Sequence, residues 1–536
     1  MIGQTVVNEH VANWSLKEKV GQLFILAFPG KSADAAEQMI AEYNLGGCYL
    51  SQDNAETFAE ARALNQSLDQ ILEKHNRLPL LLGVDQEGAW GVLVGESNTG
   101  PGNLALGVPD NVQGTSRMYR VIGEEMRSAG FNCILGPCCD VNFNPASPII
   151  DTRSFGDQPA KVSAHCAAAV SGLHDGGIVA CAKHFPGHGD TQGDSHREIP
   201  QVDKSYDELR ANDLAPFAAA IDASVDMVMT SHILYPQLDP TSPATLSSEI
   251  IEKVLHQDLG FDGIIISDSM NMGAIQHHYD AVDAAVQALA AGVTMIMLSE
   301  EHYDHSLAYF DKQVAMIQGV VAAVEQGRLD ESVIDEAVKR VVRFKYDKLE
   351  PQIRYQDVDL VQNRTIALQA AAEGVTWVRG GLDELQEKPL YLLNATPDSS
   401  YHNLVNPRGI GPNQAESAYS RFAQELKSLH PDCREVTVAG LPCADDGNII
   451  VVTENYPLPG EDFEQSAAQE LVAQLSGDYR DLIIVALRSP YDLLAYPDAR
   501  HYLCAHSSRI ESAEVTAQIL MGQCEPGYGT AVSQVS

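Results

Sequence analysis

The chain has 536 residues, 45% of them hydrophobic and 20% charged, which is typical of a globular protein with two or three domains. Its 73 acidic and 35 basic residues give a formal net charge of −38, and no cluster of Lys and Arg offsets it. Such a surface repels nucleic acid and anionic membranes, so we expect neither as a partner.

The first residues, "MIGQTVVNEHVANWSLKEKVGQLF", lack the basic start and apolar core of a signal peptide. No apolar run reaches the roughly 18 residues that a membrane-spanning helix needs. The ten cysteines are scattered, mostly in apolar runs, and lack C-x-x-C spacing, so we expect reduced, buried thiols. These features predict a cytoplasmic protein.

Eight short apolar, β-branched runs recur along the first 300 residues, and amphipathic helical patterns separate them. The runs cover residues 22–28, 45–51, 79–85, 132–138, 178–184, 226–232, 263–268 and 293–299. Nearly continuous apolar strands alternating with helices indicate a parallel sheet that is covered on both faces. Eight such units match a (β/α)8 barrel, and the alternative is a doubly wound open sheet.

Polar residues stand where five of these runs end. They are Asp85, the pair Asp140 and Asn142, the pair Lys183 and His184, His232, and Asp268. Barrel enzymes build their active sites at the carboxyl ends of the strands. The pattern therefore predicts one shared pocket.

The pattern changes after residue 300, where a long helical stretch leads into a second α/β region. We expect a barrel domain over residues 1–345, a linker over 346–375 and a smaller α/β sandwich over 376–536. The strands expected in the sandwich cover residues 389–395, 435–440, 448–454, 481–488 and 501–506. They end without an obvious catalytic cluster.

The stretch "KHFPGHGDTQGDSH", residues 183–196, combines three histidines with three glycines. His184 and His188 have the spacing of a helical zinc motif, but the Pro-Gly between them disfavours a helix, so we expect no metal. A structural turn with solvated histidines is a second interpretation. The third is catalytic, because Asp194 can orient the ring of His196 and stabilise its charged form. The glycines would let this loop fold over a substrate.

Asp268 ends the apolar run in "GIIISDSMNMGAI". It is either the N-cap of a following helix or a nucleophile at the mouth of the pocket. Retaining glycosidases need a nucleophile and an acid/base about 5 to 5.5 Å apart. Here a histidine would replace the usual second carboxylate.

"KHFPGHGDTQGDSH" and "SDSMNMGAI" resemble glycoside hydrolase family 3, in particular its bacterial β-N-acetylglucosaminidase branch. "VDQEG", "DVNFNP", "RSFGD" and "MTSHILYPQLD" resemble further blocks of that branch, in the same order. The resemblance covers residues 15–345 and continues more weakly through "ALRSPYDLL" and "GQCEPGYG". It implies a (β/α)8 barrel followed by a flavodoxin-like sandwich.

The resemblance also implies the roles of individual residues. Asp268 matches the nucleophile, and His196 matches the general acid/base with Asp194 as its partner. The residues that match sugar-binding positions are Asp85, Arg153, Lys183 and His184, and His232 lies in a matching block. One departure stands out: Ala89-Trp90-Gly91 replaces the usual Gly-Arg-Val, a change that alters the packing beneath the site or reshapes the pocket.

These implications predict a retaining, exo-acting β-N-acetylhexosaminidase without a cofactor. Its substrate would be a terminal N-acetylglucosaminide of a muropeptide, as in peptidoglycan recycling, or of a chitin oligomer. One alternative is a phosphorylase, because a histidine acid/base does not repel phosphate as a carboxylate would. The others are a β-glucosidase of the same family and a non-catalytic sugar-binding barrel.

Overall fold

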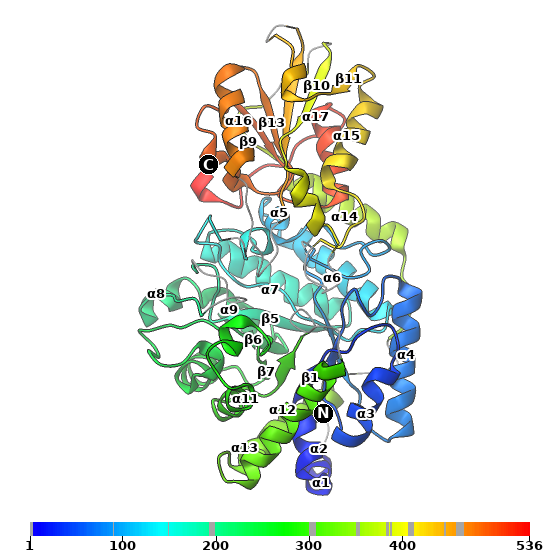
Figure 1. The fold of residues 1–536 in the computed structure, drawn as a ribbon, viewed down its shortest axis with the longest axis vertical. Helices are drawn as coiled ribbons and strands as arrows, with labels where there is room; N and C mark the ends of the chain where they lie inside the picture. The colour runs from blue at the N-terminus through cyan, green and yellow to red at the C-terminus, as the bar shows by residue number, and fades with distance from the viewer. Residues whose placement is uncertain are drawn as a thin grey trace.

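The computed structural model describes residues 4–88, 90–147, 149–191, 199–299, 307–349, 354–381, 385, 388–405, 412–443, 446–456 and 466–535. It contains two α/β domains stacked along the long axis of the molecule (Figure 1). The amino-terminal domain forms the lower part of this view, and the carboxy-terminal sandwich forms the upper part.

All eight predicted runs of the first domain contain a strand. The strands are β1 (Phe24–Leu26), β2 (Gly47–Tyr49), β3 (Leu81–Val84), β4 (Cys133–Ile134), β5 (Val179–Phe185), β6 (Met227–Thr230), β7 (Ile264–Ile266) and β8 (Ile296–Leu298). They form one parallel sheet in the order β7-β6-β5-β4-β3-β2-β1-β8. A parallel bridge between Ile266 and Met295 joins β7 to the segment before β8 and closes the barrel, so the doubly wound alternative is wrong.

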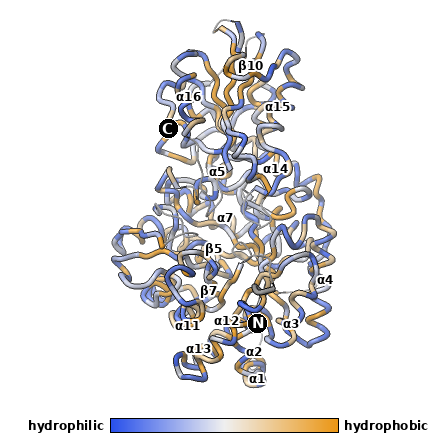
Figure 2. Tube along the Cα trace, viewed as in Figure 1, coloured by the Kyte–Doolittle hydropathy of each residue, from blue (hydrophilic) through white to orange (hydrophobic). Residues whose placement is uncertain are grey.

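Helices cover the outside of the barrel because one face of each is apolar. The main ones are α3 (Asp34–Tyr43), α4 (Phe58–Lys74), α6 (Val112–Ser128), α7 (Pro159–Asp175), α9 (Ala215–Asp222), a helix at Glu249–Asp258, α11 (Ala281–Ala290), α12 (Leu307–Glu325) and α13 (Glu331–Lys348). Shorter helices are α1 (Gln4–Asn13), α2 (Leu16–Gly21), α5 (Asn103–Gly107), α8 (Tyr206–Ala211) and α10 (Gly273–Gln276). Apolar residues run along the inner strands, and hydrophilic residues gather on outer turns (Figure 2).

The second domain contains a six-stranded sheet in the order β11-β10-β12-β13-β14-β9. Its strands are β9 (Thr376–Arg379), β10 (Leu390–Asn394), β11 (Cys433–Glu435), β12 (Asn448–Thr453), β13 (Ile483–Ala486) and β14 (His501–Cys504). The five parallel strands β10 to β14 have the flavodoxin-like order 2-1-3-4-5. β9 adds an antiparallel edge that the sequence did not predict.

Alternation along β12 explains how this sheet is covered on both faces. Ile449 and Val451 pack into one core with α16 (Ser466–Asp478), whereas Ile450 and Val452 pack into the other with α15 (Ala418–Leu429) and α17 (Ile510–Leu520). The strand expected over residues 435–440 is largely wrong. β11 ends at Glu435, and a 3-10 helix covers Val438–Gly440.

The region expected to be a linker contains the helix α14 (Leu360–Gly374). It packs against α5 and α6 of the barrel and against α17 of the second domain. The second domain therefore rests on the segment that follows β3, and ion pairing of Arg488 with Asp151 joins it to the segment that follows β4. No described helix is both long and apolar enough to span a membrane. All ten cysteines are free thiols.

Candidate active site

Asp85 and Lys183 meet at the carboxyl ends of β3 and β5. The Lys183 ammonium lies 2.6 Å from a carboxylate oxygen of Asp85 and 2.6 Å from one of Glu87. Tyr49, at the end of β2, donates a hydrogen bond of 3.0 Å to the second oxygen of Asp85. Burial lowers the pKa of Lys183, but the charges of Asp85 and Glu87 outweigh it and raise that pKa above its usual range. Lys183 is therefore a fixed cation.

Arg153 lies in a short 3-10 helix, Asp151–Arg153, and forms a two-point ion pair with Glu87. Its Nε and Nη2 atoms donate to the two carboxylate oxygens at 2.9 and 3.0 Å. Burial raises the pKa of Glu87, but Arg153 and Lys183 together hold it well below its usual range. Glu87 lies in "VDQEG" but was not among the predicted site residues.

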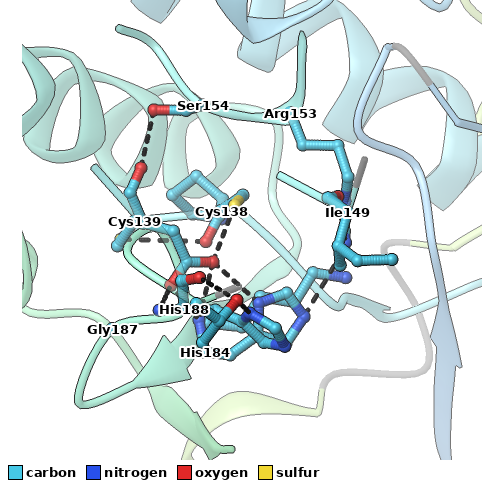
Figure 3. Close-up of polar contacts among 12 residues, drawn as sticks. Cys138, Cys139, Ile149, Arg153, Ser154, His184, Gly187 and His188 are labelled. Atoms are coloured by element: carbon cyan, nitrogen blue, oxygen red, sulfur yellow. Dashed lines mark hydrogen bonds and ion pairs between the residues drawn. The ribbon is translucent and has the colours of Figure 1, made fainter. Parts of the chain in front are cut away.

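His184 lies between a buried carboxylate and Arg153 (Figure 3). Its Nδ1 is 2.8 Å from Asp140, and its Nε2 is 3.4 Å from Nη2 of Arg153. Asp140 also accepts hydrogen bonds from the backbone N–H groups of His184 and His188 and from the thiol of Cys138. Burial raises the pKa of Asp140, but His184 and these donors hold it low. Asp140 thus fixes the ring of His184, a role that was not predicted from the sequence.

Cys138, Asp140 and His184 bring one potential metal-ligating atom each to within 4.8 Å of one another. Both oxygens of Asp140 already accept hydrogen bonds, and the Arg153 guanidinium lies 3.4 Å from His184. A cation there would compete with these donors and meet the positive charge of Arg153. The arrangement favours an orienting network over a metal centre.

The first part of the loop after β5 is held against the barrel. Tyr235 donates to the carbonyl of Gly187, and the N–H of Asn144 donates to the carbonyl of Gly189 at 3.1 Å. A Cβ atom at position 189 would lie 1.7 Å from the carbonyl oxygen of Val141, so glycine is required by close packing. The expectation that the loop glycines let the loop fold over a substrate stays a prediction, and Gly189 is needed for packing in the described conformation. Burial lowers the pKa of His188 to about 4, so this ring is neutral.

Asp194 and His196, predicted as the acid/base pair, lie outside the described residues. Asp268 is half-buried just beyond β7, and the N–H of Ser269 donates to its carboxylate at 2.7 Å. His232 is fully buried, and its ring contacts the residue that follows Asp268. The ring nitrogens of His232 lie 2.9 Å from the Thr245 hydroxyl and 3.0 Å from the Ser269 carbonyl. These contacts support the segment that carries Asp268, and a contact of His232 with sugar stays a prediction.

Trp90, the departure from the family pattern, is buried and stacks on Arg153. The Arg153 guanidinium carbon lies 3.9 Å from the ring centroid, a cation–π distance. The indole therefore supports the face of Arg153 while Glu87 holds its edge.

These contacts assemble a preformed polar wall. Asp85, Lys183, Glu87 and Arg153 alternate in charge, and His184 adjoins the last of them. Oriented donors and acceptors of this kind suit the hydroxyl groups of a sugar. The structure thus brings four of the five predicted sugar-binding residues together.

Known proteins share this architecture. Residues 15–344 match the Glycosyl hydrolase family 3 N terminal domain. Beta-hexosaminidase A of Pseudoalteromonas piscicida is 31% identical over 327 residues, covering 58% of this chain and 54% of that protein. Beta-hexosaminidase LpqI of Mycobacterium bovis is 30% identical over 342 residues, covering 62% of this chain and 83% of that protein. The chain thus spans about half the length of the first relative and most of the second.

A solved structure covers both domains. It is a glycoside hydrolase family 3 beta-N-acetylglucosaminidase from Paenibacillus sp. str. FPU-7, with a TM-score of 0.84 and 29% identity over 97% of this chain and 98% of that chain. The domain match covers well over half of the 536 residues. The chain belongs to glycosyl hydrolase family 3.

Proposed function

We propose that this chain is a retaining, exo-acting β-N-acetylhexosaminidase that removes terminal β-linked N-acetylglucosamine. The observation that carries the proposal is the wall formed by Asp85, Lys183, Glu87 and Arg153. It lies at the carboxyl ends of the parallel barrel strands, and Asp268 follows β7 at the same end. The named activities of the similar proteins support the N-acetylglucosamine specificity.

In this proposal the polar wall binds the terminal sugar. Asp85 accepts from sugar hydroxyls while Tyr49 and Lys183 hold its carboxylate in place. Arg153 donates and His184 donates or accepts at the neighbouring positions, and Asp140 keeps the His184 ring oriented. Because these groups are held before the sugar arrives, little ordering of side chains opposes binding.

Asp268 is the proposed nucleophile. It attacks the anomeric carbon, the leaving group departs with the bonding electron pair, and a covalent glycosyl-enzyme forms. The hydrogen bond from the Ser269 N–H orients one oxygen of Asp268 and leaves the other for attack. Water then attacks the intermediate and releases the sugar with retained configuration.

Asp194 and His196 are the proposed acid/base pair. His196 gives a proton to the leaving oxygen in the first step and takes one from water in the second. Asp194 selects the tautomer of the ring and stabilises its charged form. Hydrogen bonds hold the start of this loop, from Gly187 to Thr191, against the barrel. This supports the proposal that the loop brings His196 to the bound sugar from one direction.

The natural substrate is proposed to be a cytoplasmic muropeptide or a cytoplasmic chitin fragment. A muropeptide substrate would give the enzyme a role in peptidoglycan recycling. The boundaries after residues 345 and 375 are likewise proposed as the limits of the barrel and the linker.

In a β-glucosidase arrangement the acid would come from the second domain. Single replacements of its acidic residues would then cost about a hundred- to ten-thousandfold in rate.

The test is hydrolysis of nitrophenyl β-N-acetylglucosaminide, measured beside the β-glucoside and β-xyloside. We expect wild type to hydrolyse the β-N-acetylglucosaminide and to hydrolyse little of the β-glucoside or the β-xyloside. We expect Asp268→Asn to hydrolyse none of the three. The products are also analysed in phosphate buffer, where a sugar 1-phosphate would identify a phosphorylase. Failure to turn over any of the three glycosides would favour the non-catalytic sugar-binding barrel.

A further inference from the structure

Arg509 of the second domain reaches the loop that carries Glu87. Its side chain is 1% exposed and lies just before α17. Its guanidinium donates to the carbonyl oxygen of Gly88, in the barrel, and to that of Pro412, in its own domain. The second domain thus touches the residue next to a member of the sugar-binding wall.

Arg509 is unusual because it is a buried cation without an ion-pair partner among the described residues. Its Nη2 atom also has no hydrogen-bond partner within the part of the chain that the structure describes. Burial lowers the pKa of Arg509 to about 10, so it is still charged at neutral pH. Burying such a charge costs free energy, and among the described residues the two carbonyl oxygens and the charge of Glu511 offset it. An apolar side chain could fill the same space without this cost of burial. The charge of Arg509 therefore indicates a role beyond filling space.

The loop that Arg509 contacts is a tight turn. The N–H of Glu87 donates to the carbonyl of Trp90 at 2.8 Å and closes it. Gly88 has a φ of +80°, and a Cβ atom there would lie 2.7 Å from the Cα of Gly102. Asn413 of the second domain donates to the carbonyl of Gly91 at 3.0 Å. Two residues of the second domain therefore hold this turn, one at each end.

A second arginine reaches the segment that carries Arg153. Arg488 forms an ion pair of 2.6 Å with Asp151 and lies 3.4 Å from the Thr152 hydroxyl. Asp151 has a φ of +33°, which is unfavourable for a residue with a side chain. The ion pair with Arg488 holds Asp151 in this conformation, two residues before Arg153.

The space that remains beside Trp90 at this interface is small. A cavity of about 10 Å³, lined by Trp90, Pro412, Tyr456 and Arg488, has room for about one water molecule. The second domain therefore packs closely against the turn.

We propose that Arg509 and Arg488 of the second domain are positioning residues that hold the Glu87 turn and the Arg153 segment in register, so that the sugar-binding wall is complete only with both domains in place. Neither arginine is assigned a contact with sugar or with a reacting atom. The expected loss of enzymatic rate rests on the proposed function, whereas the expected displacement of the Glu87 turn does not.

The position of the turn is measured by the fluorescence of Trp90. The chain contains three tryptophans, so Trp14→Phe with Trp377→Phe leaves Trp90 as the sole indole. In this background we expect Arg509→Ala to shift the Trp90 emission to the red and to increase its quenching by acrylamide. The matched control is Arg434→Ala, which removes an exposed arginine of the same domain that pairs with Asp432. Unchanged emission in a folded Arg509→Ala protein would overturn the proposal, whatever the enzyme activity is.

The second measurement is steady-state kinetics with nitrophenyl β-N-acetylglucosaminide. Leaving the Gly88 carbonyl without its donor should lower kcat/KM by about 10- to 100-fold, chiefly through KM, because sugar binding suffers before chemistry does. Arg488→Ala should act in the same direction, Arg509→Lys should lose less, and Arg434→Ala should leave the rate unchanged.

Chemical rescue separates positioning from general destabilisation. Guanidinium ion at a low, non-denaturing concentration should lower the KM of Arg509→Ala toward the wild-type value, and it should leave Arg434→Ala unaffected. A fall in kcat at constant KM, with no rescue, would show that the arginine does not act by positioning. A wild-type protein that turns over no glycoside refutes the proposed function, and the fluorescence result then decides the positioning role alone.

Discussion

The Arg153 guanidinium and the Glu87 carboxylate form a buried two-point ion pair, with N–O distances of 2.9 and 3.0 Å. Lys183 contacts the same carboxylate at 2.6 Å and continues to Asp85. One carboxylate therefore fixes two cations that come from different segments of the barrel. Replacing Glu87 tests whether the wall depends on this shared anion.

Glu87→Gln should lower both stability and activity. The amide removes the charge and leaves Arg153 and Lys183 facing each other in a buried site. Breaking a buried pair in this way costs about 3–5 kcal/mol of unfolding free energy, and kcat/KM should fall by about 100-fold or more. Denaturant unfolding and steady-state kinetics measure the two effects. The control Glu124→Gln breaks a more exposed pair with Arg120 and should change stability by at most about 0.5 kcal/mol.

Asp268 should form the covalent bond to the sugar. A slow 2-deoxy-2-fluoro or 5-fluoro glycoside should leave an adduct on the peptide that contains Asp268, detected by mass spectrometry. The control is Asp262→Asn, an exposed carboxylate before β7, which should still be labelled at Asp268. An adduct on another carboxylate, or inversion at the anomeric carbon, would contradict the assignment.

His196→Ala should lose most activity where the leaving group needs a proton. With a chitobiose-like substrate the rate should fall by about a hundred- to ten-thousandfold, and the basic limb of the pH–rate profile should disappear. The first step with a nitrophenyl glycoside should change much less, because that leaving group departs unaided. Asp194→Asn should act in the same direction but more mildly. Equal losses on both substrates would make His196 a binding residue only.

Much of the barrel could be predicted because its strands are buried on both faces. Their apolar runs are continuous, and polar residues such as Asp85 and Lys183 mark the ends. β9 was missed because it adds an antiparallel edge to a parallel sheet, and its four residues carry no alternation of their own.

The partners of the site residues could not be predicted. Glu87 and Asp140 are ordinary loop carboxylates in the sequence, and only the fold brings Arg153 and His184 to them. The contact of Arg509 with Gly88 joins residues 421 positions apart and leaves no periodic signal. Loop glycines also have two physical uses, and sequence alone did not distinguish mobility from the close packing found at Gly189.

Asp492, at the interface between the domains, should make stability depend on pH. Burial, with repulsion from Asp151, raises its pKa from an ordinary value near 3.8 to about 7, although Arg488 opposes the rise. The folded state therefore binds this proton more tightly than the unfolded state. The resulting stability is fully present below about pH 4 and is lost as the pH rises to 7. Asp492→Asn keeps an uncharged group of similar size, so it should remove this dependence and be more stable than wild type at pH 8 by about 2–4 kcal/mol. Urea unfolding at pH 5 and pH 8 measures the difference, with the exposed Asp478→Asn as the control. The prediction is contradicted if the free energy of unfolding changes equally between pH 5 and pH 8 in wild type and in Asp492→Asn. That result would show that Asp492 is charged at both pH values and that Arg488 neutralises it.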